Sequence, residues 1–254
     1  MPKDAALTVT DLVVRFGGVT ALAGVSFTVP RGEVCGLIGP NGAGKTTLFD
    51  CVSRLTRPRS GRIELAGRDL LALPAHRVAE LGVARTFQHL GLVPSLSVRE
   101  NVMLGAQGAG IGFVPAALRL PGLRAREREL RDRADAVLDR LALGGIAARP
   151  AAGLPYGTLK RIELARALAA GPDLLMLDEP ASGLSHEEVD ELAGLIEDVR
   201  ADMTVLLVEH HMGMVMRLSD TVVVLDFGRV VATGTPDQVR EDSAVLAAYL
   251  GTPA

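Results

Sequence analysis

The sequence predicts an α/β fold: a mostly parallel sheet flanked by helices, with an N-terminal antiparallel β subdomain and an inserted helical subdomain. Three observations support this prediction. Segments of strand length alternate with helical segments of about 10–15 residues, which is typical of a parallel sheet covered on both faces. The first 30 residues instead read as neighbouring strands, and several helical segments interrupt the alternation in the middle of the chain.

The composition is that of an ordinary globular chain. Its 254 residues allow one large domain or two small ones, and 48% of them are hydrophobic, enough for a substantial core. The net charge of −3 predicts a mixed surface and gives no reason to expect a nucleic-acid partner. Cys35 and Cys51 lie in apolar segments, so we expect buried free thiols, as in a reducing cytosol. The N-terminus lacks the features of a secretory signal, and no apolar run approaches the ~20 residues that cross a bilayer.

The predicted N-terminal strands are LTVTDLVVRF and VSFTV, which are rich in β-branched residues and bracket a turn in GGVTALAG, residues 17–24. EVCGLIG is a continuous apolar run, as expected of a strand buried on both faces of a parallel sheet. The next segments predict a helix in TTLFDCVSRL and a strand in SGRIELAG.

A different pattern begins near residue 88. Helices are predicted in SVRENVML and at residues 124–143, separated by a loop with several glycines and prolines at residues 105–122. The charge run of residues 124–133 predicts a solvated helix face. We therefore divide the single domain, residues 1–254, into a core at about 1–88 and 159–254 and a helical subdomain at about 89–158.

After residue 158 strands and helices alternate again. LLMLDE and MTVLLVEH are predicted strands, and the helices SHEEVDELAGLIEDVR and HMGMVMRL follow them. The chain closes with two further strands and a last helix, in TVVVLDF, GRVVATG and a segment that ends at AAYLG.

Residues 39–46, GPNGAGKT, match the pattern G-x-x-x-x-G-K-[ST] between a predicted strand and a predicted helix, the context that this motif requires. In such a loop, backbone N–H groups surround phosphate oxygens at the positive end of the helix. We predict a P-loop NTPase core in which Lys45 reaches the β- and γ-phosphates and the Thr46 hydroxyl ligates Mg²⁺. The loop residues expected to bind ATP are Gly39, Pro40, Asn41, Gly42, Ala43, Gly44, Lys45, Thr46 and Thr47.

Two carboxylates, Asp178 and Glu179, end the predicted strand LLMLDE. Buried carboxylates are costly unless they serve a cation or a reaction. We expect Asp178 to hold Mg²⁺ through water and Glu179 to orient and deprotonate the attacking water. Such a pair also occurs as a helix cap, but its place behind a phosphate loop favours the catalytic interpretation.

Three further residues are candidates by position. A lone histidine is more often structural, but His210 follows another predicted strand, at the edge where open parallel sheets gather ligands. It would hold the γ-phosphate and the water. Gln88 lies between the core and the helical subdomain and could sense Mg²⁺. Phe16 is either a core residue or the face on which adenine stacks, which would add it to the ATP-binding residues.

The order and spacing of GPNGAGKTT, Gln88, LPYGT, LLMLDEP, SGLS and His210 resemble the ATP-binding subunits of ABC transporters over essentially the whole chain. In finer detail, VRFGG, RTFQHL, VEHHM and the closing GTP…AYLG resemble the ATPase of branched-chain amino-acid uptake systems. This resemblance implies an ATPase with Lys45, Glu179 and His210 as catalytic residues and Mg²⁺ held near Thr46, Gln88 and Asp178. It would energise the uptake of a small solute: the family suggests branched-chain or other hydrophobic amino acids, whereas close paralogues could serve urea or other small solutes.

The resemblance also implies partners. These are a second ATPase subunit, identical or different, two transmembrane permease subunits that Gln88 and the neighbouring helices contact, and a solute-binding protein at the far side of the membrane. The chain would be cytoplasmic, peripheral on the inner face of the cell membrane, with no nucleic-acid partner. Two ATP molecules would lie between two subunits, with the phosphate loop of one facing the signature residues of the other, Leu154, Pro155, Tyr156, Gly157 and Thr158.

Three positions depart from the wider family pattern: Pro155 in place of Ser, Thr158 in place of Gln, and His211 in place of Asp. Pro155 lacks a hydroxyl and an N–H, but proline suits the start of a helix. The N–H groups of residues 156–158 and the helix dipole remain available for an anion. We expect a working but weakened half-site, in which Gly157 cannot be replaced because a side chain would stand between the backbone and the phosphate.

Other classes of protein fit less well. Non-transport ABC ATPases of DNA repair or translation usually carry long coiled-coil insertions or two tandem cassettes, and the sequence shows neither. A P-loop kinase or GTPase would not explain LPYGT, and the guanine-reading N-K-x-D is absent from the sequence. A regulatory subunit that only binds nucleotide is disfavoured by the intact Glu179 and His210.

Overall fold

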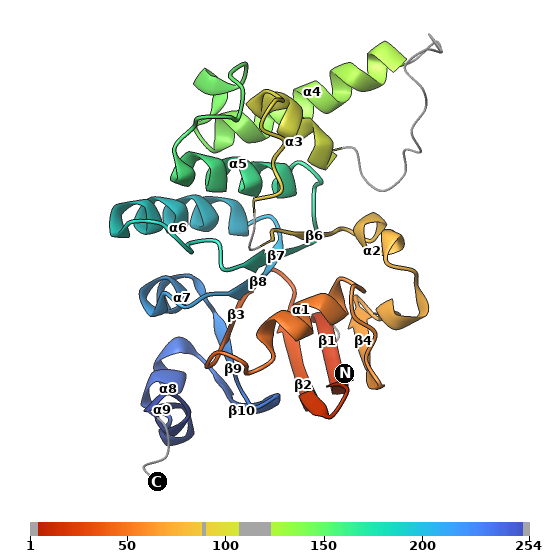
Figure 1. Ribbon diagram of the computed structural model, residues 1–254, viewed down its shortest axis with the longest axis vertical. Coiled ribbons are helices and arrows are strands. Elements are labelled where there is room, and N and C mark those ends of the chain that lie inside the picture. Colours follow the sequence, from red (N-terminus) through yellow and green to blue (C-terminus); the bar gives the residue numbers. More distant parts are fainter. Residues whose placement is uncertain (1–4, 88–89, 107–122, 251–254) are drawn as a thin grey trace.

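The computed structural model describes residues 5–87, 90–106 and 123–250. In this part of the chain, a six-stranded sheet has the order β10-β9-β3-β8-β7-β6, and a four-stranded antiparallel sheet has the order β2-β1-β4-β5 (Figure 1). Helices cover the larger sheet, and one group of them lies beyond α6 at the top of the view. The predicted α/β fold with an N-terminal antiparallel sheet is therefore confirmed.

The antiparallel sheet begins with a long hairpin. Strands β1 (Ala5–Phe16) and β2 (Val19–Pro30) pair up to Phe16 and Val19, so only Gly17 and Gly18 form the turn. The predicted turn at residues 17–24 is wrong, because β2 continues through this segment to bury Leu22 completely in the core. The sheet is completed by β4 (Ser60–Leu65) and β5 (Arg68–Asp69).

The larger sheet is parallel except for its last strand. Its members are β3 (Val34–Ile38), β6 (Val83–Arg85), β7 (Leu174–Asp178), β8 (Thr204–Val208), β9 (Thr221–Asp226) and the antiparallel β10 (Arg229–Gly234). All residues of β3, β7 and β8 are buried, as their continuous apolar sequences predict. Alternate residues face opposite sides: Leu175 and Leu177 join the hydrophobic cluster with the helices, whereas Leu174 and Met176 join the cluster with α1 and the antiparallel sheet.

The helices follow the predicted order with additions. They are α1 (Lys45–Val52), α2 (His76–Glu80), α3 (Val98–Ala106), α4 (Leu123–Arg140), α5 (Tyr156–Leu168), α6 (His186–Arg200), α7 (Met212–Leu218), α8 (Pro236–Glu241) and α9 (Ser243–Leu250), with 3-10 turns η1 (Leu70–Ala72) and η2 (Gly144–Ile146). The sequence did not predict α2, α8 or the short strand β6. Most of the predicted loop at residues 105–122 lies outside the described residues.

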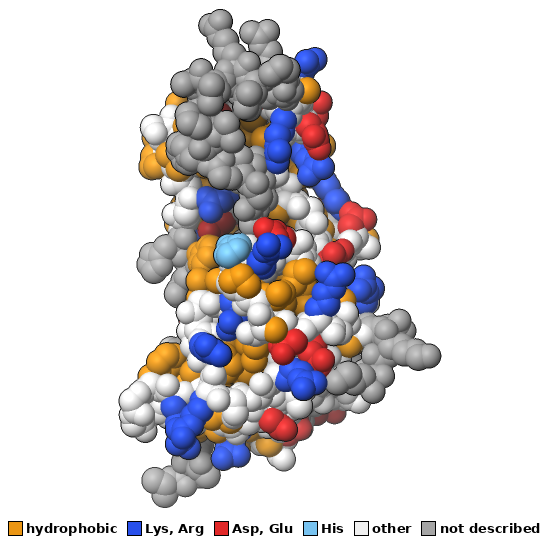
Figure 2. Space-filling view, turned by 90° about the vertical axis from the view of Figure 1, so that its right-hand side faces the viewer, with side chains coloured by type: hydrophobic (Ala, Val, Ile, Leu, Met, Phe, Trp, Pro, Cys, Tyr) orange, Lys and Arg blue, Asp and Glu red, His pale blue; other side chains and the backbone are white. Residues whose placement is uncertain are grey.

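Surface and burial agree with the composition. The charged residues of α4 between 125 and 133 are exposed, as predicted, and include the ion pair of Glu129 with Arg133 at 3.0 Å. On the face in Figure 2, acidic and basic side chains are interspersed with hydrophobic ones. Cys35 and Cys51 are buried free thiols, and burial raises the pKa of each to about 12. None of the helices in the described ranges is long and apolar enough to span a bilayer.

Candidate active site

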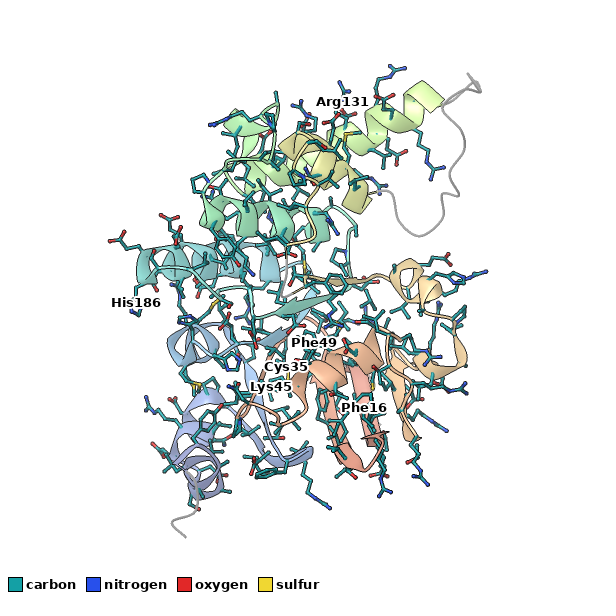
Figure 3. All side chains as sticks on the ribbon, in the orientation of Figure 1. Phe16, Cys35, Lys45, Phe49, Arg131 and His186 are labelled. Carbon is teal, nitrogen blue, oxygen red and sulfur yellow. The ribbon has the colours of Figure 1, made fainter. Side chains whose placement is uncertain are left out.

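The phosphate loop joins β3 to α1, and Lys45 is the first residue of that helix. Its amine is buried and donates to the carbonyl oxygens of Gly39 at 2.7 Å and Pro40 at 3.0 Å, so the side chain folds back over the loop. Burial lowers the pKa of Lys45, and the negative charges of Glu179 and Asp178 act against that shift. The two predicted carboxylates thus act on the lysine electrostatically, and Lys45 lies near the centre of the molecule (Figure 3).

Packing against β9 requires glycine at Gly39. Its φ is 149°, and a Cβ there would lie 2.0 Å from the carbonyl oxygen of Leu225 on β9. The N–H of Gly228, which follows β9, donates to the carbonyl of Ala43 at 3.0 Å. The loop is thus held by backbone contacts to β9 and to the turn that follows it, and its N–H groups are positioned before any ligand arrives.

Glu179 and His210 come together at the ends of β7 and β8. Oε1 of Glu179 lies 2.6 Å from Nε2 of His210, and the Glu179 N–H donates to the carbonyl of Val208 at 2.9 Å. The strands end at Asp178 and Val208, slightly earlier than predicted, and Glu179 has a φ of 49°. A left-handed backbone at a non-glycine residue is costly and is common at functional sites. This turn aims the Glu179 carboxylate at His210.

Glu209 was missed by the sequence analysis. It is 2% exposed, and its carboxylate accepts N–H groups from Ala181 at 2.7 Å, His210 at 2.7 Å and His211 at 3.0 Å. It therefore ties the segment after β7 to the segment after β8. The rule that identified Asp178, a carboxylate at the end of a buried apolar strand, also applies to LLVEH and could have found it.

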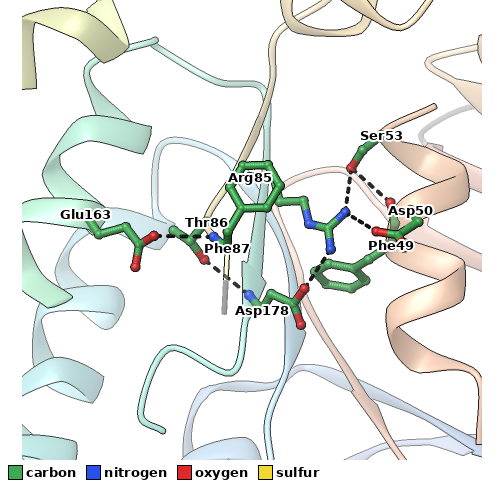
Figure 4. A network of polar contacts seen from close by, with 8 residues as sticks. All are labelled: Phe49, Asp50, Ser53, Arg85, Thr86, Phe87, Glu163 and Asp178. Carbon is green, nitrogen blue, oxygen red and sulfur yellow. Dashed lines mark hydrogen bonds and ion pairs between the residues drawn. The ribbon is translucent and has the colours of Figure 1, made fainter. Parts of the chain in front are cut away.

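Arg85, the last residue of β6, is a second residue that the sequence analysis missed. Its guanidinium contacts Asp178 at 2.7 Å and Asp50 of α1 at 2.7 Å (Figure 4). Burial raises the pKa of Asp178, whereas the hydrogen bond and positive charge of Arg85 lower it. Two residues further on, the N–H of Phe87 donates to Glu163 of α5 at 3.4 Å.

The signature residues lie at the start of α5. Pro155 is the N-cap residue with a φ of −55°, and residues 156–158 form the first helical positions, whose N–H groups have no intrahelical acceptor. Within the chain, Gly157 lies against Glu188, a contact that the sequence did not predict. A Cβ there would lie 2.4 Å from Oε1 of Glu188, so a side chain points at a carboxylate of the same chain. Leu154 is buried, whereas Tyr156 is 43% exposed.

The remaining predicted residues have different environments. Phe16 is 54% exposed at the end of β1, so it is not a core residue, and Figure 3 shows it on the antiparallel sheet. Thr46 is exposed on the loop side of α1, whereas Thr47 is half-buried. Gln88 lies outside the described residues.

Known protein families match most of the chain. The model of the ABC transporter family matches residues 22–182. The chain belongs to the ABC transporter family. A second model, of the branched-chain amino acid ATP-binding cassette transporter, matches residues 229–254.

Curated relatives and solved structures agree with this assignment. The branched-chain amino acid transport ATP-binding proteins BraF of Pseudomonas aeruginosa and LivG of Escherichia coli K12 are 41% and 42% identical, each over 96% of this chain and 97% of the relative. A nucleotide-free ATP-binding cassette of an ABC transporter superposes with a TM-score of 0.85 at 28% identity, covering 98% of this chain and 100% of that one. The ADP conformation of an ATP-binding cassette gives 0.83 at 26% identity, covering 98% and 99%. The resemblance seen in the sequence is confirmed: this ABC protein is an ATP-binding and ATP-hydrolysing subunit of an ABC importer.

Proposed function

We propose that this ABC subunit hydrolyses Mg-ATP to drive the import of branched-chain or other hydrophobic amino acids. The relatives named for branched-chain amino acid transport match it over 96% of its length, and the C-terminal family model carries the same description. The solute itself would be bound by partner proteins, so this chain contributes the chemical energy.

The contact of Glu179 with His210 is the observation that supports hydrolysis most directly. In the proposed site, Glu179 activates the water and His210 orients the water and the γ-phosphate. Lys45 and the loop N–H groups bind the phosphates, and exposed Phe16 offers its ring to adenine. A protein that only binds nucleotide would not need a carboxylate and an imidazole 2.6 Å apart beside the phosphate loop.

The residues present also fit Mg²⁺. Asp178 and Thr46 supply hard oxygen ligands, and Mg²⁺ is usually held by one or two protein oxygens together with substrate phosphates. Arg85 contacts both Asp178 and Asp50 of α1, the helix that begins in the phosphate loop, which supports the closeness of Asp178 to that loop. When bound, the metal would neutralise charge on the phosphates, and Gln88 would add an amide oxygen.

The signature segment, residues 154–158, supports a proposal about partners. We propose that a second ATPase subunit presents its phosphate loop to residues 154–158, where the start of α5 offers free N–H groups. Two permease subunits would contact the helical subdomain, residues 89–158, on the inner face of the membrane, and a solute-binding protein would act at the far side.

Uptake of labelled leucine into vesicles tests this proposal. The vesicles would contain the proposed permease subunits, with the solute-binding protein outside and ATP inside. We expect uptake with the wild-type chain and none with Lys45→Ala, whose loop retains its glycines. Hydrolysis without uptake of leucine, isoleucine or valine would contradict the proposed class of solute. Absence of hydrolysis in the assembled complex would contradict the proposed ATPase mechanism.

A further inference from the structure

Arg85 is buried between two carboxylates that come from different elements (Figure 4). Its Nη2 lies 2.7 Å from Oδ2 of Asp178, and its Nη1 lies 2.7 Å from Oδ1 of Asp50. The side chain of Arg85 is 7% exposed and that of Asp178 is 5% exposed. One guanidinium thus joins β6 to the end of β7 and to α1, the helix that begins in the phosphate loop.

Two aromatic rings fix the plane of this guanidinium. Its central carbon lies 5.4 Å from the ring centre of Phe49 and 5.1 Å from that of Phe87, within the range of cation–π contacts. The planar fork of arginine can then direct two nitrogens at two acceptors, which the single amine of lysine cannot do. The orientation of Arg85 is therefore set by packing as well as by its ion pairs.

Stability alone explains this arrangement poorly. Buried ion pairs often contribute nothing net to folding, because desolvation offsets the attraction. Among the described residues, Nε of Arg85 is buried without a hydrogen-bond partner, which adds a further cost. Because burial of Arg85 costs folding free energy, and because the residue lies at the edge of the predicted active site, we looked for its role in that site.

The charges and lone pairs around Asp178 indicate that role. The cluster has one positive charge against the two carboxylates of Asp50 and Asp178, so it still attracts a cation. Arg85 donates one hydrogen bond to Oδ2 of Asp178. A carboxylate can accept about four hydrogen bonds, so Asp178 can still accept hydrogen bonds from metal-bound water. The backbone N–H of Asp178 is held by Thr86 Oγ1 at 3.2 Å, so the residue is fixed at both its backbone and its side chain.

We propose that Arg85 is the positioning residue for the metal carboxylate: it orients Asp178 toward Mg²⁺ and shields it from Asp50. The inference rests on the proposed function, in which Asp178 serves the metal. In this role Arg85 contacts the metal carboxylate and not the metal. Loss of such a contact typically lowers metal affinity by 10–100-fold. Arg85 does not touch nucleotide or metal in this proposal.

A Mg²⁺ titration of ATP binding tests this with the purified full-length chain. ATP affinity is measured by displacement of trinitrophenyl-ATP, first in EDTA and then at increasing Mg²⁺. For Arg85→Gln we expect the affinity in EDTA to stay within about twofold of wild type, because the phosphate loop is intact. The Mg²⁺ concentration at half-maximal effect should rise by about 10–100-fold. Arg85→Lys keeps the positive charge but lacks the planar guanidinium. Its Mg²⁺ midpoint should lie between those of wild type and Arg85→Gln.

Arg99→Gln is the matched control. Arg99 also pairs with an aspartate, Asp135 at 2.6 Å, but on α3 and α4. We expect its Mg²⁺ midpoint to equal that of wild type. An unchanged midpoint for Arg85→Gln, or an equal shift for Arg99→Gln, would overturn the inference. A wild-type chain that binds no ATP under either condition would overturn the nucleotide site itself, and with it the role of Arg85.

A double variant covers the case in which Arg85→Gln does not fold. Arg85→Gln with Asp50→Asn removes the like charge that the single variant leaves facing Asp178. The Mg²⁺ midpoint should remain raised, because Asp178 still lacks its partner. Recovery of the wild-type midpoint would mean that Arg85 only neutralises Asp50, and would refute the positioning role.

Discussion

Glu179 and His210 meet across the ends of two neighbouring parallel strands, with Oε1 of Glu179 2.6 Å from Nε2 of His210. The histidine side chain is 45% exposed and the glutamate 15%, so the pair lies at the surface where a nucleotide could reach it. The left-handed φ of 49° at Glu179 directs the carboxylate out of the sheet. The left-handed conformation at Glu179 costs conformational free energy, and this contact accompanies that cost.

Glu179→Gln should abolish most turnover while ATP binding is retained. Glutamine has nearly the same shape and can still bond to His210, but it cannot take a proton. Loss of a general base typically lowers the rate by ~10²–10⁴-fold. Phosphate release and ATP titration would be measured side by side, with Glu187→Gln on the exposed start of α6 as the control. Turnover near that of wild type would rule out Glu179 as the base.

Glu209→Gln should weaken both folding and catalysis. The carboxylate accepts three N–H groups, and an amide would turn an NH₂ group toward at least one of them. Hydrogen bonds to a charged group are worth about 1.5–3 kcal/mol, so the free energy of unfolding should fall by about that amount. Because His210 is one of the donors, kcat should fall as well, while KM for ATP changes little.

Urea denaturation and steady-state kinetics would check this prediction. Glu33→Gln is a suitable control, since Glu33 accepts from Thr221 at 3.2 Å, near the start of β9. A destabilised Glu209→Gln with unchanged kcat would mean that Glu209 supports the fold without placing His210.

The central strands could be predicted because consecutive apolar residues indicate a strand that is buried on both faces. LLMLD is apolar up to its last residue and TVLLV is apolar after its first, and all their positions are buried. The strand β6 could not be predicted in this way. It has three residues, and its last is an arginine whose burial depends on Asp50 and Asp178, far away in the sequence.

The environment of the signature also depends on distant residues. Sequence alone indicates that Pro155 begins a helix and leaves three N–H groups free, which the structure bears out. It cannot show that the capping glutamate of α6, Glu188, lies against Gly157. Glu188 is the group that a side chain at residue 157 would meet within its own chain.

The two cysteines should resist alkylation in the folded protein. Both are completely buried, and burial raises the pKa of each to about 12, so the reactive thiolate is scarce at pH 8. We expect negligible labelling by iodoacetamide up to pH 9, and labelling of both Cys35 and Cys51 in urea. Mass spectrometry of the labelled peptides distinguishes the sites. Fast labelling of either cysteine at pH 8 without urea would contradict the structure.

Pro155→Ser should strengthen the nucleotide-dependent dimer. Serine adds a hydroxyl and an N–H at the N-cap of α5, where proline makes no side-chain hydrogen bond. A hydrogen bond to a charged phosphate contributes about 1.5–3 kcal/mol, or roughly ten- to a hundredfold in the dissociation constant. Sedimentation with ATP in the Glu179→Gln background would measure it, since slow turnover preserves the complex. No change in dimer affinity would place residue 155 away from the partner's phosphate.

Gly157→Ala distinguishes a contact within the chain from a contact with the partner's nucleotide. The new Cβ would lie 2.4 Å from Oε1 of Glu188, whose carboxylate completes the capping box of α6 with Ser185. We expect Gly157→Ala to lower the free energy of unfolding by ~1 kcal/mol through loss of that cap, and to lower ATPase activity in the permease-bound complex. In a Glu188→Ala background the same substitution should cost little, because the atom that it meets is gone. The two single variants and the double variant form a cycle that measures this coupling. An equal loss of activity from Gly157→Ala in both backgrounds would instead mean that the methyl group obstructs the partner's phosphate, as the sequence first suggested.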